Sequence, residues 1–178
     1  GYDHSMELLA KDAGMTLDAY KKSVGVLDAA GIADVFIQLN IAKSTTASAV
    51  TRNDKIPFAY NYVDKNTKIT HMDDEQGEHG SHVAGIAAAN KYIANADGTF
   101  SNALETAKVQ GVAPDAQLVV MKVFGYGGGA YDSDYMAAIE DAIVLGCDSI
   151  NLSLGSSDPG FTRATDIQKR FDALSDKG

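Results

Sequence analysis

The first 43 residues carry apolar side chains at helical spacing. Between residues 5 and 43 these side chains recur mostly three and four positions apart, which is the spacing of a helix with one buried face. Gly14 and Gly31 interrupt this pattern, and glycine weakens or ends a helix. We therefore expect helices over residues 5–43, followed by a polar surface loop over residues 44–55.

Three later segments have the pattern of strands. Residues 58–63 and residues 149–154 are short, largely apolar runs. Residues 117–123 (QLVVMKV) are almost entirely apolar and rich in β-branched side chains, which is typical of a strand covered on both faces. Small and apolar side chains over residues 79–86 predict a buried helix, and residues 93–110 predict a surface excursion.

Two further helices complete an alternation of strands and helices. Residues 133–145 predict a helix that is capped by Ser133 or Asp132 and stopped by Gly146, and residues 162–175 predict an amphipathic last helix. The inward side chains of the former are Tyr135, Ala138, Ile139, Ala142 and Ile143. Such an alternation predicts an α/β fold, a parallel sheet with helices on both faces.

The pattern also predicts an incomplete sheet. A helix stands last where the alternation calls for another buried strand. A sheet of three parallel strands keeps open edges, and open edges favour association with other chains. We therefore expect the chain to be a piece of a larger domain and to self-associate through its sheet edges.

Composition narrows the class of protein. Of the 178 residues, 45% are hydrophobic and 22% are charged, the balance of a folded globular protein. The net charge of −9 argues against nucleic acid and against anionic membrane surfaces as partners. Cys147 is the one cysteine, so an internal disulfide and a cysteine-based metal site are excluded. No apolar run reaches the ~18 residues of a membrane span, and residues 1–20 carry no signal-peptide pattern.

Residues 79–86 (HGSHVAGI) are the most informative stretch for chemistry. A histidine that opens a helix places its imidazole at the positive helix end, which favours a neutral ring able to accept a proton. The octet resembles the histidine motif of the subtilisin-like serine proteases (subtilases), with Ser81 in place of the usual threonine. Residues 111–125 and 138–155 are similar to further blocks of that family, in the same order. Residues 55–64 (KIPFAYNYVD) resemble the cell-envelope group of lactocepin and C5a peptidase.

The resemblance implies a serine endopeptidase that cleaves peptide bonds in proteins through an aspartate, histidine and serine triad. His79 is the implied general base, but neither the serine motif (GTSMA) nor the aspartate motif occurs in the chain. Asp28 lies in a similar segment with one residue too many before its glycine, so we interpret it as a helix-surface residue. The resemblance thus predicts an inactive fragment, whose aspartate lies before Gly1 and whose serine lies beyond the chain.

The resemblance also implies a domain layout, a substrate groove and a location. Residues 1–54 are similar to a helical insertion with a loop, and residues 55–178 to an α/β core segment. The implied substrate-binding residues form two walls around an extended protein or peptide substrate: Gly127, Gly128 and Gly129, and Ser153, Leu154 and Gly155. Glycine suits such a wall because no side chain intervenes between the two backbones. The family implies a secreted or cell-envelope protein.

Other interpretations explain fewer residues. A metal site would use His71, Asp73, Asp74, Glu78, His79 and His82. His79 and His82 lack the spacing and the glutamate of the zinc helix motif, and the acidic run suits a solvated loop. Residues 127–129 lack a phosphate-loop ending, which disfavours nucleotide binding, and a tight turn is the simpler alternative there. We expect no metal and no cofactor. The main alternative is a catalytically inactive subtilase-like module that binds peptides.

Overall fold

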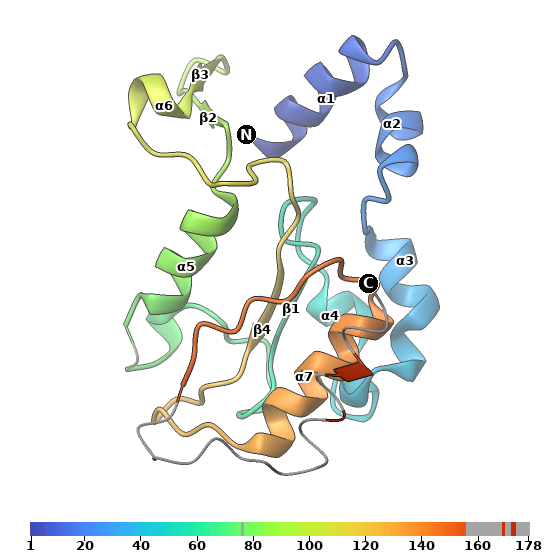
Figure 1. Cartoon of the computed structure of the whole chain (residues 1–178), viewed down its shortest axis with the longest axis vertical. Coiled ribbons are helices and arrows are strands. Elements are labelled where there is room, and N and C mark those ends of the chain that lie inside the picture. Colours follow the sequence, from blue (N-terminus) through green and yellow to red (C-terminus); the bar gives the residue numbers. More distant parts are fainter. Residues whose placement is uncertain (76, 156–168, 170–171, 174–178) are drawn as a thin grey trace.

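Helices make up the N-terminal third of the chain in the computed structural model, which describes residues 1–75, 77–155, 169, 172 and 173. The elements there are α1 (Tyr2–Asp12), α2 (Leu17–Ser23), α3 (Ala29–Val35), the 3-10 turns η1 (Phe36–Gln38) and η2 (Asn40–Lys43), and the short α4 (Ala47–Val50) (Figure 1). The prediction of helices over residues 5–43 is confirmed. The predicted loop at 44–55 is interrupted by α4, because Val50 turns into the core.

Two glycines separate the first three helices, but only one of them was expected to do so. Gly14 has a φ of +68° and follows α1, whereas the second break lies at Gly25, with a φ of +71°. Gly31 lies inside α3. Asp28 caps that helix, because its Oδ1 accepts a hydrogen bond from the Gly31 backbone N–H at 2.8 Å. Asp28 is therefore a surface capping residue, as its place in the helical pattern indicated.

A short parallel sheet forms the centre of the rest of the molecule. Strand β1 (Phe58–Asn61) pairs in parallel with β4 (Val119–Lys122), in register from Phe58 opposite Val119 to Asn61 opposite Lys122. All four residues of β1 are buried, whereas those of β4 are only partly buried. In Figure 1 the strands lie between α5 (His79–Ala88) on one side and α3, α4 and α7 (Asp132–Val144) on the other.

The predicted surface excursion contains a small hairpin of its own. Strand β2 (Tyr92–Ala94) pairs antiparallel with β3 (Phe100–Asn102), and α6 (Ala103–Thr106) follows directly. The Ala103 amide donates to the Lys91 carbonyl at 2.9 Å, so the chain enters and leaves the hairpin at one place. The hairpin is thus closed at its base.

The predicted third strand at 149–154 is wrong. This segment forms no strand, and its side chains are exposed. Ile150, Leu152 and Leu154 alternate with polar residues, so only one face is apolar, and in Figure 1 the segment runs across the direction of β4. A strand needs a neighbour aligned along its length to satisfy its backbone groups. The predicted helix at 162–175 falls on residues that, apart from 169, 172 and 173, lie outside the described part of the chain.

Two predicted helices are present with differences in detail. Helix α5 spans the expected residues, but among them only Ala88 is buried, because no described element covers the outer face of this helix. Helix α7 begins after Tyr131, without a side-chain cap, so neither Ser133 nor Asp132 caps it. It ends before Gly146, which has a φ of +77°.

The main core lies where α7 packs against β1 and the N-terminal helices. Its buried members are Ile32, Leu39, Ile41, Val50, Phe58, Tyr60, Tyr62, Ala138 and Leu145. On α7 the fully buried set contains Met136 and Asp141, which the pattern did not predict, whereas Tyr135 and Ile143 are only partly buried. The inward face of α7 is therefore rotated slightly from the predicted one.

Asp141 connects three elements inside this core. Its side chain is completely buried, its Oδ2 accepts the Tyr62 hydroxyl at 2.9 Å, and its Oδ1 accepts the Asn40 backbone N–H at 2.7 Å. Burial raises the pKa of the Asp141 carboxyl, and the hydrogen bonds from Asn40 and Tyr62 partly oppose that rise. The carboxyl thus holds η2, the residue after β1 and α7 together.

Replacing Asp141 by alanine should lower the free energy of unfolding by about 2–4 kcal/mol, because the buried Tyr62 hydroxyl and the part-buried Asn40 N–H lose their acceptor. Urea unfolding at pH 7 measures the loss. The exposed Asp148 is a matched control, and Asp148→Ala should change the stability by less than about 0.5 kcal/mol. Equal losses in the two variants would contradict the connecting role of Asp141.

The wild-type chain and Asp141→Ala can also be compared as a function of pH. Because the pKa of Asp141 is raised in the folded state, the folded protein binds this proton more tightly than the unfolded chain, so the residue contributes more stability as the pH falls. The loss of unfolding free energy caused by Asp141→Ala should therefore be larger at pH 5 than at pH 7. A loss that becomes smaller on acidification would show that the pKa of Asp141 is lowered instead.

Candidate functional site

His79 is the first residue of α5 and is exposed. The residue before it, Glu78, takes the N-cap position without making a side-chain capping bond. The first turn of α5 therefore presents backbone N–H groups beside the imidazole, which is the positive end of the helix. The structure confirms a helix that begins at this histidine. Its catalytic role stays a prediction.

Two other histidines stand near His79 along the chain and share one carboxylate. Glu78 places Oε1 3.7 Å from His71 Nε2 and Oε2 3.7 Å from His82 Nε2. The His82 side chain is 73% exposed. The ring of His82 is therefore open to solvent, because the outer face of α5 is uncovered.

The six residues of the alternative metal site do not gather around one point. Within the part of the chain that the structure describes, no group of three or more histidine, cysteine, aspartate or glutamate side chains is placed to hold a metal ion. Asp73 instead accepts the Thr70 hydroxyl at 2.7 Å and the Thr70 backbone N–H at 3.1 Å. These bonds lower the pKa of Asp73. The acidic run therefore behaves as a structured loop.

Asp74, the next residue, forms a buried ion pair. Its Oδ2 lies 2.5 Å from Lys122 Nζ, and the two side chains are only 3% and 13% exposed. Lys122 is the last residue of β4, so the pair connects the loop before α5 with the end of the central strand. The one sign of this contact in the sequence is that Lys122 is the single charged residue in a strand that is otherwise nearly all apolar.

The glycine segment, residues 125–129, closes into a tight turn just beyond β4. The Gly125 N–H donates to the Gly129 carbonyl at 2.9 Å and the Gly128 N–H donates to the Gly125 carbonyl at 3.0 Å. Gly128 has a φ of +81°, which favours glycine there. Gly127 and Gly129 are exposed. The turn expected as the simpler alternative is thus present, and exposed backbone remains on it.

The other predicted wall, Ser153, Leu154 and Gly155, lies in the exposed segment after α7. Ser153 Oγ accepts a hydrogen bond from Asn151 Nδ2 at 2.9 Å. This segment is not paired with β4, so the two predicted walls are not joined through a common sheet. Their shared role in binding a substrate stays a prediction.

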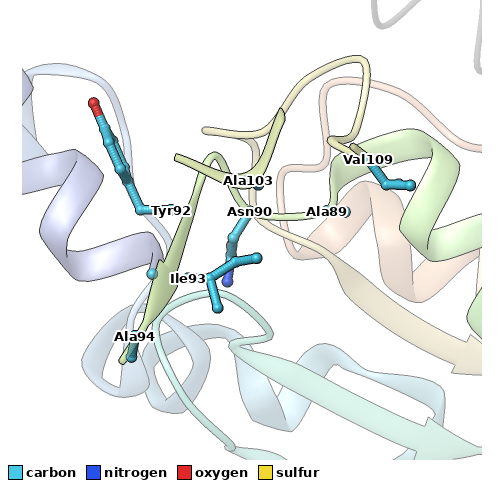
Figure 2. A pocket seen from close by; sticks show the side chains of 8 residues that line it. Ala89, Asn90, Tyr92, Ile93, Ala94, Ala103 and Val109 are labelled. Carbon is cyan, nitrogen blue, oxygen red and sulfur yellow. The ribbon is translucent and has the colours of Figure 1, made fainter. Parts of the chain in front are cut away.

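A pocket of about 500 Å³ lies beside Ala89, at the end of α5 opposite to His79. Its lining is mostly apolar and comes from the hairpin and the segments around it, and Figure 2 shows Ile93 and Asn90 projecting among these residues. The Asn90 Oδ1 atom is buried without a hydrogen-bond partner. The pocket is therefore separate from the predicted catalytic histidine.

Cys147 is not a nucleophile in this structure. It lies just beyond α7 and packs against the core cluster. Burial raises the pKa of its thiol to about 11, and the charge of Asp148 adds to the rise. Because the thiolate is the reactive form, the chain holds this sulfur in its unreactive state at neutral pH.

No described helix is both long and apolar enough to cross a membrane.

Comparisons with known proteins agree on one family. The model of the subtilase family matches residues 20–177. The PI-type proteinase of Lactococcus lactis is 42% identical over 107 residues, covering 58% of this chain and 5% of that protein. The minor extracellular protease Vpr of Bacillus subtilis is 40% identical over 103 residues, covering 55% of this chain and 11% of that protein. The C5a peptidase of Streptococcus pyogenes is 36% identical over 128 residues, covering 71% of this chain and 10% of that protein.

This chain thus spans between 5% and 11% of the length of these relatives. No solved structure matches the chain.

The state of Cys147 can be tested by alkylation. At pH 8 a thiol whose pKa is about 11 is thiolate in only about one molecule in a thousand, against roughly a quarter for an unperturbed cysteine. Iodoacetamide should therefore modify the folded chain at least about 100-fold more slowly than the chain unfolded in urea. Mass spectrometry over time gives both rates. Similar rates in the two states would contradict the burial of this sulfur.

Proposed function

The chain belongs to the subtilase family, and from this premise we propose that it is part of the catalytic domain of a serine endopeptidase. The observation that carries the proposal is the family match over residues 20–177 together with an exposed histidine at the start of α5. Residues 1–54 serve as a helical insertion with a loop, and residues 55–178 as a segment of an α/β core with helices on both faces of a parallel sheet.

His79 acts as general base and then as general acid in this proposal. It takes the proton of a serine hydroxyl as that serine attacks the substrate carbonyl, and it returns the proton to the leaving amine. An exposed ring at a helix start is suited to this task because solvent and substrate can both reach it. The serine and the aspartate that orients the imidazole come from the longer protein, because this chain carries neither motif.

The glycine segment and residues 153–155 form the two walls that bind an extended peptide. The exposed backbone at Gly127 and Gly129 supports this role, because peptide backbone can pair only where no side chain blocks it. The relatives named as proteinases and peptidases support a protein or peptide as substrate. The relative named as an extracellular protease supports a secreted or cell-envelope location.

An uncovered apolar surface supports the proposal that this chain is a fragment. Ile86 on α5 and Val112 are 69% and 87% exposed. The Val112 N–H donates to the Ile86 carbonyl at 3.0 Å, so the two exposed residues are neighbours, and we call them the uncovered patch. Apolar surface of this kind is normally covered in a complete domain. The covering residues come from the remainder of the catalytic domain.

A serine-reactive fluorophosphonate probe tests the chemistry. The chain alone should stay unlabelled, because it lacks the nucleophile motif, whereas a longer protein that contains it should be labelled on one serine and should cleave casein. In the longer protein His79→Gln should lower kcat/KM by about 10⁴-fold or more, as expected for loss of a general base. The matched control is His4→Gln on α1, which should stay within about twofold of wild type.

Stoichiometric labelling of any serine in the 178-residue chain would contradict the fragment proposal. A longer protein that binds peptides but is neither labelled nor active would instead identify an inactive peptide-binding module.

The uncovered patch should make the isolated chain self-associate. Size-exclusion chromatography with light scattering should give a mass that rises with concentration above the 18.8 kDa of one chain, because burying the patch removes apolar surface from water. Introducing Ile86→Glu and Val112→Glu together should restore the mass of one chain. Ile37→Glu, at a position on η1 that is 83% exposed, is the control and should leave the association unchanged.

A wild-type chain that remains monomeric at all concentrations and unfolds in one sharp, high-temperature transition would show that this segment is stable without further covering residues.

A further inference from the structure

The carboxyl ends of β1 and β4 meet at one edge of the sheet, where a hydrogen-bonded network surrounds the glycine segment. β1 ends at Asn61 and β4 ends at the paired residue Lys122. Binding sites in parallel sheets lie at this edge, because the loops that follow neighbouring strands come together there. The residues that hold the glycine segment are therefore candidates for a role in substrate binding.

Asn61 is a buried member of this network. Its side chain is buried to 1% exposure, and all of its hydrogen-bonding groups are used within the turn after β1. Asn61 Nδ2 donates to Asp64 Oδ2 at 2.9 Å and to the Lys68 carbonyl at 3.2 Å. Asn61 Oδ1 accepts the backbone N–H groups of Val63 at 3.2 Å and Asp64 at 3.0 Å. A buried amide whose donors and acceptor all have hydrogen-bond partners in this way fixes the position of Asp64.

Asp64 in turn holds the first residues of the glycine segment. Its Oδ2 accepts the Tyr126 backbone N–H at 2.9 Å, from a residue 62 positions further along the chain. Gly125 approaches the same turn so closely that a Cβ atom there would lie 2.7 Å from Val63 Cγ1 and 3.0 Å from Asp64 Oδ1. Gly125 is buried. The glycine segment is thus seated directly on the turn after β1.

A second contact acts at the same edge. The buried ion pair of Asp74 and Lys122 joins the loop before α5 to the end of β4, three residues before the glycine segment begins. Three separate groups, Asn61, Asp64 and Lys122, therefore hold this edge together. A buried or charge-assisted contact of this type resists displacement better than an exposed ion pair does.

We propose that Asp64 is a substrate-positioning residue: anchored by Asn61, it fixes the exposed backbone of the glycine segment in the place where an extended peptide pairs with it. The inference rests on the proposed function, because it assigns the glycine segment to the substrate groove. Asp64 does not touch the reacting atoms. It acts through the Tyr126 N–H and so affects substrate binding and alignment, while the activation of the serine by His79 is independent of it.

The first test needs only this chain. In Asp64→Ala the amide hydrogen of Tyr126 should exchange with solvent about tenfold faster, because it loses a charge-assisted hydrogen bond. The amide of Tyr62, which donates to the Lys122 carbonyl at 2.9 Å, should stay within about twofold. Asp64→Asn keeps an acceptor oxygen and should give a smaller change. Asp97→Ala is the matched control, since Asp97 accepts the Thr99 N–H at 3.0 Å in a remote turn.

The second test uses the longer protein and separates positioning from general stability. Asp64→Ala should lower kcat/KM about tenfold or more for extended peptides that reach the glycine segment, while the rate of fluorophosphonate labelling, which needs no such pairing, stays within about twofold. Asp64→Asn should recover part of the loss.

Different outcomes of the two tests would contradict different parts of the proposal. An unchanged Tyr126 exchange rate in Asp64→Ala, or equal acceleration of the Tyr62 amide, would overturn the anchoring by Asp64. Equal losses of kcat/KM and of fluorophosphonate labelling would overturn its specific role in substrate positioning. A longer protein that the probe does not label would overturn the proposed function instead, and the exchange experiment would still report on the anchor.

Discussion

The arrangement of this chain depends on one buried carboxyl group, that of Asp141. A carboxyl removed from water is stable only where donors satisfy both of its oxygens, and here the donors come from Asn40 in η2 and Tyr62 after β1. This requirement sets how α7 lies against β1 and against the N-terminal helices. The apolar side chains of the core fill the space around that contact, but they are less selective because hydrophobic packing has no direction.

From this anchored core the strands project their carboxyl ends toward the candidate site. β1 ends at the buried Asn61, and β4 ends at Lys122. Each strand end carries a polar side chain whose partner lies in the segment between β1 and α5: Asp64 for Asn61 and Asp74 for Lys122. The loops are therefore positioned by polar contacts, whereas the strands are positioned by burial. This division places rigid structure beneath the surface that we assign to peptide binding.

Much of the local structure could be predicted from the sequence, because helical periodicity and glycine breaks are local signals. The helices before residue 43 and the start of α5 at His79 follow from such signals. Burial could not be predicted in the same way, since the exposure of α5 depends on which elements pack against it. The contact of Asp64 with Tyr126 crosses 62 positions of the chain. Only the register of β1 against β4 brings these residues together, so no short-range pattern indicates it.

The closed base of the β2–β3 hairpin has a consequence for engineering. Because the Ala103 amide and the Lys91 carbonyl are joined, the span between α5 and β4 does not change when residues are added at the hairpin tip around Asp97 and Gly98. The entropic cost of a longer loop grows only slowly with its length, and exposed tips tolerate insertions best. A peptide tag or a small reporter domain inserted there should leave His79 and the glycine segment in place, at the far end of α5.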